Sequence, residues 1–173
     1  MNGQNHIIAI TPFEFHPVKE FEKRQKSIDI FTVKALQITM DAKKTTVYES
    51  KKKSKKLQDS GKIAMEHKKY IEAEEIFSQA IELNPSFGTL WTQRATCRTF
   101  LKKYEEAISD LEYVLSFNPK CTQSIIQKGN IHLELRQFDE ATILFESLRQ
   151  LGESKSADAC LKKLKDVQEL DLS

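Results

Sequence analysis

The sequence predicts an all-α fold, a superhelical solenoid built from antiparallel helix hairpins. The first observation is that small, aromatic and aliphatic residues recur every 34 positions, and the second is that prolines follow at the same step, at Pro85 and Pro119, where a proline ends a helix. Repetition at such a period is typical of stacked helix–turn–helix units that bury their apolar faces on one another. The recurring residues are Gly61, Ala95 and Gly129; Tyr70, Tyr104 and Phe138; Ala73, Ala107 and Ala141; Phe77, Leu111 and Phe145; and Ala80, Val114 and Leu148.

This period divides the chain into three units, each with two helices. The second helix of each unit is expected to begin at the aromatic residue of the repeat and to end before the proline. Glu153 stands where a third proline is expected, so the last unit departs from the pattern at its exit. The predicted units are 54–87, 88–121 and 122–155, and their first helices are expected to begin near Leu57, Trp91 and Ile125.

A further amphipathic helix is predicted over Ser156–Leu170. Three lysines and Glu169 lie between its apolar residues, and a helix of this kind covers the apolar edge that stacking leaves bare at the end of an array. We therefore expect a capping helix and tail over 156–173. Its apolar residues at helical spacing are Ala159, Cys160, Leu161, Leu164, Val167 and Leu170.

Residues 1–50 do not share the period, and their order stays open. Pro17–Lys26 is compatible with a charged helix, whereas Ile28–Met40 mixes alternating apolar positions with β-branched residues, so both helix and strand remain possible there. The stretch from Lys43 to Lys56 is expected to be an exposed linker. Its lysine-rich end, 51–56, is interpreted as a solvated linker, a nuclear-targeting patch, or a contact for an acidic partner or membrane surface.

Charge and cysteine content restrict the class of protein. The whole chain has a net charge of +2, but residues 57–173 carry 15 basic and 19 acidic side chains, so the repeats are acidic. Nucleic acid is therefore not expected as a ligand. Neither a signal peptide nor a membrane span is predicted. Three scattered cysteines without a CxxC pair favour a reducing compartment, so we expect a cytoplasmic protein, or a nuclear one if 51–56 is a targeting signal.

The sequence offers no group of residues suited to catalysis, so we expect no enzyme, metal, cofactor or small-molecule substrate. The histidines lack metal-ligand spacing, and no glycine-rich phosphate loop occurs. Cys97 lies on a predicted repeat helix without an identifiable base, so it is interpreted as an inert thiol.

The repeated residues resemble the tetratricopeptide repeat family over roughly 54–155 plus the cap. The resemblance implies that the first helices of the units line a concave face and that the ligand is a peptide segment of another protein. The hypothesis for the peptide-binding residues is therefore Lys62, Gln93, Thr96, Gln127 and Asn130. The middle unit carries the pattern through Trp91, Ala95, Tyr104, Ala107, Leu111 and Pro119.

The resemblance also implies two more specific functions beside that of a general scaffold or adaptor. Chaperone-binding members of the family hold an acidic tail with lysines, asparagines and an arginine. Only one cation stands at those places here, so the neutral amides favour hydrogen bonds to a peptide over capture of carboxylates. A weak likeness to axonemal dynein assembly and docking proteins leaves a ciliary role open. The five places are occupied by Gln58, Lys62, Gln93, Gln123 and Gln127.

Overall fold

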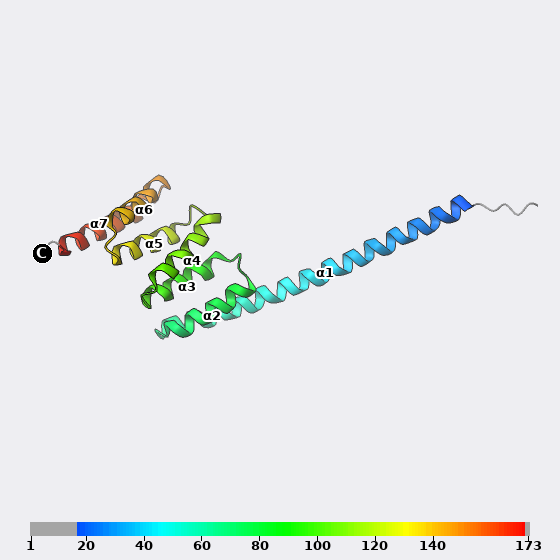
Figure 1. Ribbon diagram of the computed structural model, residues 1–173, viewed down its shortest axis with the longest axis horizontal. Helices are drawn as coiled ribbons and strands as arrows, with labels where there is room; N and C mark the ends of the chain where they lie inside the picture. Colours follow the sequence, from blue (N-terminus) through cyan, green and yellow to red (C-terminus); the bar gives the residue numbers. More distant parts are fainter. Residues whose placement is uncertain (1–16, 172–173) are drawn as a thin grey trace, which may run out of the picture. The chain divides into compact units, whose positions relative to one another are not determined.

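The computed structural model describes residues 17–171, and within that range every regular element is an α-helix (Figure 1). The predicted all-α class is confirmed. The chain forms two compact units, 1–46 and 47–173, and the boundary between them falls inside the first helix. The helices are α1 (Pro17–Glu66), α2 (Tyr70–Leu83), α3 (Gly88–Phe100), α4 (Tyr104–Phe117), α5 (Thr122–Glu134), α6 (Phe138–Gln150) and α7 (Ser154–Asp171).

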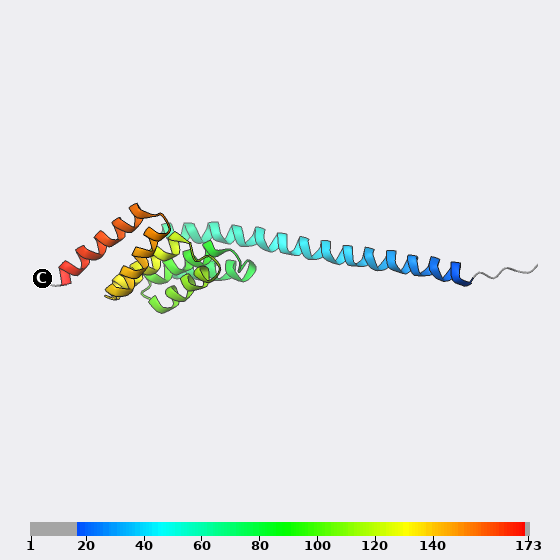
Figure 2. The same ribbon diagram turned by 90° about the horizontal axis from the view of Figure 1, so that it is seen from above.

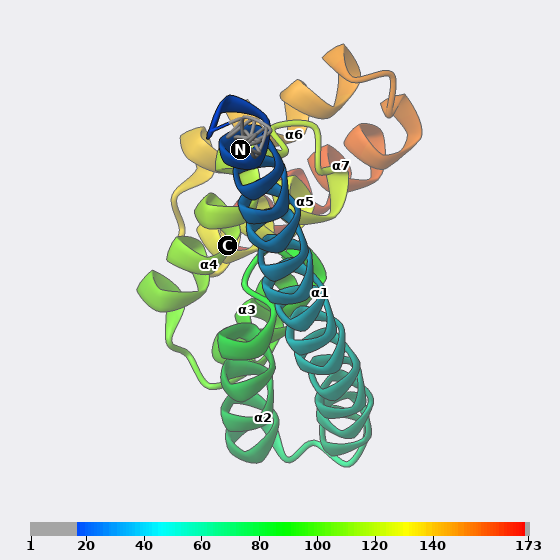
Figure 3. The same ribbon diagram turned by 90° about the vertical axis from the view of Figure 1, so that its right-hand side faces the viewer.

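The second unit is a stack of helix hairpins that follow one another in chain order. Figure 2 shows the same succession from above, from the green helices to the red α7. The second helices begin at Tyr70, Tyr104 and Phe138, as predicted, and α2 and α4 each end two residues before a proline. In Figure 3, α2 lies alongside the last turns of α1, and the hydroxyl of Ser54 donates to the carbonyl oxygen of Ala80 at 2.8 Å.

The turn inside each hairpin repeats with the same period. Lys68, Lys102 and Arg136 adopt positive φ angles of 57°, 62° and 60°. After α1, the amide of Lys69 donates to the carbonyl oxygen of Ala64 at 2.9 Å, which closes the helix end. Glycine is the usual residue at such a position, so the sequence gives no direct signal for these turns.

The small residue on each first helix makes room for a large residue on the second. A Cβ atom added to Gly61 would lie 2.7 Å from Cε1 of Phe77, and one added to Gly129 would overlap the ring of Phe145. These glycines therefore let the two helices of a hairpin approach closely. In the middle hairpin the corresponding pair is Ala95 and Leu111. Alanine is larger than the glycine of the other hairpins, and leucine is smaller than their phenylalanine.

The predicted linker at 43–56 is wrong, because these residues belong to α1. No glycine or proline occurs between Pro17 and Ser60, and lysine is a good helix former whose long stem leaves its charge in water. The same helix includes 28–40, where strand had stayed open. Pro17 is the first helical residue, a position where its missing N–H costs nothing. The N-terminal part of the predicted segment 1–50, residues 1–16, lies outside the described residues.

Helix α7 covers the predicted cap and extends slightly further at both ends, but Ala157 is buried instead of the predicted Ala159, and Leu170 is exposed. Ala157 and Leu164 of α7 are buried and join Phe145 and Leu148 of α6 in one apolar cluster. The array is therefore closed by α7. Among the described residues, no helix is long and apolar enough to cross a membrane.

Candidate functional site

Side-chain amides connect the first helices of successive repeats. Nε2 of Gln58 on α1 donates to Oε1 of Gln93 on α3 at 2.8 Å, although the two residues are 35 positions apart. Nζ of Lys55 donates to Oε1 of Gln58 at 2.9 Å, so both ends of this amide are used. Gln58 is only 2% exposed, whereas Lys55 remains exposed. This pair links the first helices of the first and middle repeats.

The same connection continues from α3 to α5. Nε2 of Gln127 donates to Oγ1 of Thr96 at 2.9 Å, and that hydroxyl donates in turn to the carbonyl oxygen of Thr92 at 2.9 Å. Oε1 of Gln127 is buried and has no hydrogen-bond partner within the described part of the chain. A buried acceptor without a partner costs free energy, so a hydrogen-bond donor to this oxygen would stabilise the protein.

The capping helix contributes a cation to this surface. Nζ of Lys163 on α7 donates to Oδ1 of Asn130 on α5 at 2.9 Å. Sequence reasoning missed Lys163, because α7 lies outside the 34-residue register and its lysines look like ordinary polar positions of an amphipathic helix. It also missed Lys55, since its stretch was interpreted as a linker.

The five predicted site residues therefore lie on three first helices. The structure connects Thr96 directly to Gln127, whereas Gln93 is bonded to Gln58 and Asn130 to the cap. Lys62 is exposed on α1, one helical turn beyond Gln58. The family resemblance implies that the first helices line a concave face, and on that basis we name one surface the amide groove. It consists of Gln58, Lys62, Gln93, Thr96, Gln127 and Asn130, together with Lys55 and Lys163.

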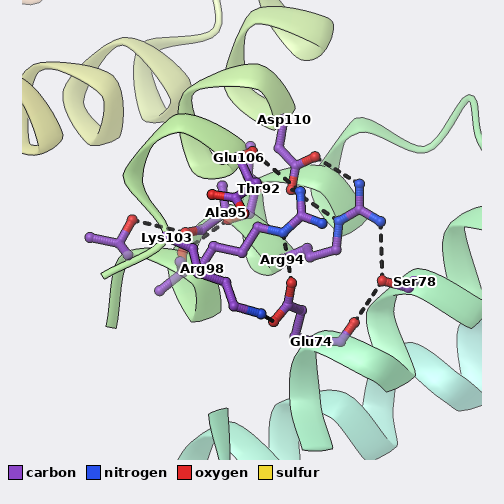
Figure 4. A network of polar contacts seen from close by, with 11 residues as sticks. Glu74, Ser78, Thr92, Arg94, Ala95, Arg98, Lys103, Glu106 and Asp110 are labelled. Atoms are coloured by element: carbon purple, nitrogen blue, oxygen red, sulfur yellow. Dashed lines mark hydrogen bonds and ion pairs between the residues drawn. The ribbon is translucent and has the colours of Figure 1, made fainter. Parts of the chain in front are cut away.

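A second polar cluster joins α2, α3 and α4 (Figure 4). Arg94 contacts Asp110 through two hydrogen bonds, Nε to Oδ2 at 3.0 Å and Nη2 to Oδ1 at 2.7 Å, and donates a third to Oγ of Ser78 at 3.1 Å. Its guanidinium also lies 4.9 Å from the ring centroid of Trp91. The Asp110 side chain is only 3% exposed, so this charge is compensated entirely inside the protein.

The cluster continues through Arg98, which lies 2.9 Å from Oδ2 of Asp110 and 2.9 Å from Oε1 of Glu74. Lys103 contacts the other oxygen of Glu74 at 2.8 Å. Burial raises the pKa of Glu74, but the hydrogen bonds and positive charges of Lys103 and Arg98 outweigh it, so the net pKa lies below the ordinary value. Because its charges satisfy one another, this cluster stabilises the stack and offers little to a ligand.

Residues that could carry chemistry are placed unfavourably for it. Burial, with the negative charge of Glu74 nearby, raises the pKa of the Cys97 thiol to about 11, so it stays protonated at neutral pH. Nδ1 of His132 lies 2.7 Å from Oε1 of Gln137, a contact within one hairpin. No group of three potential metal ligands occurs in the described residues.

Known proteins resemble this chain in its helical array. The family model of the tetratricopeptide repeat matches residues 57–87 and 88–121. Heat shock protein STI1 of Saccharomyces cerevisiae is 32% identical over 98 residues, which cover 56% of this chain and 17% of that protein. Protein STIP1 homolog of Dictyostelium discoideum is 30% identical over 114 residues, which cover 66% of this chain and 18% of that protein. The chain thus spans less than a fifth of either relative.

Solved structures show the same fold. The Arabidopsis OM64 TPR domain superposes with a TM-score of 0.62 at 22% identity and covers 68% of this chain and 98% of its own. The first TPR of Spaghetti (RPAP3), solved with the HSP90 peptide SRMEEVD, superposes with a TM-score of 0.61 at 23% identity, covering 71% and 96%. The family match and the stacked hairpins agree: residues 57–121 match the tetratricopeptide repeat model, and the helical array has the fold of tetratricopeptide repeat domains.

Proposed function

We propose that the amide groove binds an extended peptide segment of a partner protein, so that the chain acts as a non-catalytic interaction module. The observation that carries this proposal is the row of polar side chains across three first helices, with Gln58 bonded to Gln93 and Gln127 to Thr96. Fixed amides present donors and acceptors at defined places, and a peptide backbone carries both groups at regular spacing.

Charge supports the same proposal. Lys55 and Lys163 each donate to an amide of the groove. Lys62 is exposed one helical turn beyond Gln58, so it adds a third ammonium group to these first helices and the cap. Such a groove favours a peptide with carbonyl and some acidic groups. The unpartnered Oε1 of Gln127 also matches a peptide N–H that a small side-chain rearrangement would admit.

The test is affinity capture from a cell extract with the full chain and with the double variant Lys62→Glu and Gln93→Glu. The carboxylate at position 93 can still accept from Gln58, so the fold should persist while the groove becomes acidic. We expect specific partners to be lost from the captured set. The unfolding free energy from thermal melts should stay within about 0.5 kcal/mol of the parent, as is usual for substitutions on a surface.

The control Gln79→Glu repeats the glutamine-to-glutamate half of the double variant at an exposed position on α2. It should retain every partner of the parent chain. Retention of all partners by the double variant, with the control unchanged, would place the binding surface outside the amide groove.

The second candidate is a co-chaperone that binds acidic tails of heat-shock proteins. It is favoured by the relatives, which include a protein described as Hsp70-Hsp90 organizing protein 3 of Arabidopsis thaliana, 30% identical over 83 residues. Against it stand four glutamines at the five places for a carboxylate clamp, since a neutral amide forms weaker bonds to a carboxylate than a cation does. Lys163, from outside the repeats, partly restores positive charge.

Calorimetric titration with the peptide SRMEEVD separates the two candidates. The neutral groove predicts a dissociation constant weaker than about 100 μM, a binding free energy near −5.5 kcal/mol. Low-micromolar binding that is lost in Lys62→Ala would make the co-chaperone function the better description. We place the protein in the cytoplasm, on the support of its three free cysteines.

A further inference from the structure

The part of α1 in the first unit carries apolar side chains on an exposed helix. Phe31 is 71% exposed and Ile38 is 69% exposed. With Ala35 and Ala42, which are also exposed, they recur at intervals of four, three and four residues. Residues at these intervals lie on one side of a helix, so they form a continuous strip, which we call the Phe31 stripe.

We propose that the Phe31 stripe pairs with the same stripe of a second copy of this chain, with the two helices antiparallel. In a two-stranded antiparallel arrangement, successive layers place Phe31 against Ala42 of the second copy, and Ala35 against Ile38. Every layer then combines one large and one small side chain. Layers of nearly equal volume let the two helix axes stay at a constant distance, which close packing requires.

Charge complementarity supports the same arrangement. Lys34 and Asp41 each precede one of the stripe's alanines and lie along one flank of it. The antiparallel register places Lys34 of each copy next to Asp41 of the other, so two opposite-charge contacts form by symmetry. The other flank carries the uncharged Thr32 and Thr39. Flanking charges of this kind select the orientation and partner of paired helices.

A parallel pair in register fits these residues less well. It would place Phe31 against Phe31 and Ala35 against Ala35, so wide and narrow layers would alternate. Lys34 would then lie near Thr39 of the second helix instead of near Asp41. Neither volume nor charge is complementary in that arrangement.

The opposite side of the helix also carries apolar residues, among them Val33, Leu36 and Met40, which are 64%, 63% and 53% exposed. The next position at the same spacing is Lys43, so this side is interrupted by a charge where an interface needs an apolar residue. It therefore provides a matched control. The proposal concerns a surface separate from the amide groove and does not depend on peptide binding.

Sedimentation equilibrium of the full chain over a range of protein concentrations tests the association. We expect a reversible dimer for the parent and a monomer for Ile38→Glu, which buries a charge in the stripe. Met40→Glu introduces the same charge on the opposite side and should leave the dimer intact. A parent chain that is monomeric throughout, or a dimer that is lost in Met40→Glu but kept in Ile38→Glu, would overturn the proposal.

Charge reversal tests the orientation. Lys34→Asp should weaken the dimer, because each introduced carboxylate would face Asp41 of the other copy, and Asp41→Lys should weaken it by placing two lysines together. A mixture of these two variants should form a heterodimer, since one chain then presents two acids and the other two lysines at the facing places. The doubly reversed chain, Lys34→Asp with Asp41→Lys, should form homodimers again. If the two single variants, their mixture and the doubly reversed chain all dimerised equally well, the antiparallel register would be overturned.

Discussion

The middle repeat and the third repeat share one backbone pattern but stabilise it with different chemistry. In the middle repeat, Arg94 and Arg98 on α3 enclose the buried carboxylate of Asp110 on α4. In the third repeat, 34 positions later, the residue at the place of Asp110 is Leu144, which packs against an apolar cluster. One repeat therefore buries ions where the other buries hydrocarbon.

The remaining positions follow the same division. Lys128 takes the place of Arg94 and forms an ion pair with Glu112 at 2.7 Å, in which the Glu112 side chain is 58% exposed. His132 takes the place of Arg98 and contacts Gln137 within its own hairpin. In the third repeat the cation at this place, Lys128, is therefore paired with an exposed carboxylate and not with a buried one.

This difference shows that the repeat period specifies backbone geometry more strictly than it specifies side-chain contacts. A buried ion pair tolerates the loss of one partner poorly, since the remaining charge is left without compensation. An apolar contact loses only the area that is removed. The two repeats should therefore differ sharply in how they respond to substitution at equivalent places.

The largest effect is expected for Asp110→Ala. It leaves Arg94 and Arg98 without their shared carboxylate, and removal of one partner from a buried ion pair typically costs about 3–5 kcal/mol. Urea unfolding followed by circular dichroism measures the change. A loss below about 1 kcal/mol, the typical ceiling for a surface ion pair, would show that solvent already compensates these charges.

The next largest effect is expected where the small residue of a first helix packs against the large residue of the second helix. Gly129→Ala should destabilise the third hairpin by about 1–3 kcal/mol, because the added methyl group overlaps the ring of Phe145. Adding Phe145→Leu reproduces the Ala95 and Leu111 pair of the middle hairpin, so it should recover part of the loss. Thermal melts of the single and double variants test this. The proposed equivalence would be contradicted if the double variant lost more stability than the two single variants lose together.

Glu74 makes the ion cluster of the middle repeat sensitive to acid. Its pKa is lower in the folded chain than its ordinary value of 4.5, so the folded state holds fewer protons on this group than the unfolded state. The stability it contributes is complete above pH 4.5 and is lost as the pH falls through the lowered pKa. Glu74→Gln should therefore be less stable than the parent at neutral pH.

To check this pH dependence, we compare the unfolding free energies of the parent and Glu74→Gln from neutral pH to below 4.5. The difference in unfolding free energy between the two proteins should narrow with acidification, because the parent then loses a charge that the variant never carries. A gap that stays constant across this range would mean that the charge of Glu74 is not what stabilises the cluster.

The smallest effect is expected for Lys128→Ala in the third repeat. Its partner Glu112 is largely exposed, and ion pairs near solvent contribute about 0–1 kcal/mol. Urea unfolding at low and high salt measures it. A cost as large as that of Asp110→Ala would remove the distinction between the two repeats.

Much of the fold could be predicted from particular residues. The aromatic positions predicted where α2, α4 and α6 begin, because they recur at one step, and Pro85 and Pro119 predicted where α2 and α4 end. The region 43–56 could not be assigned correctly, since its lysines suit both a solvated linker and a helix. Ser54, near the end of this region, and Gln58, just after it, are buried and bond to the neighbouring helices, contacts that the sequence of α1 does not reveal.

The sequence predicted which helices carry the candidate site residues but not the contacts that these residues make. The repeat register placed Gln93, Thr96 and Gln127 on first helices, which is a local property of each segment. It did not predict that Gln58 would pair with Gln93, or that Lys163 would reach Asn130. Residues far apart in the sequence meet only when the helices are stacked.

The sequence by itself determined the period, the hairpin boundaries and the cap, because these depend on helix propensity, proline stops and apolar spacing along a single segment. Tertiary structure alone decided which polar groups share a hydrogen bond and which charges lose contact with water. Arg94 and Lys128 occupy the same place in the register, yet one contacts a buried carboxylate and the other an exposed one. The physical reason is that hydrogen-bond and ion-pair energies depend on distances and burial between helices, which no single helix contains.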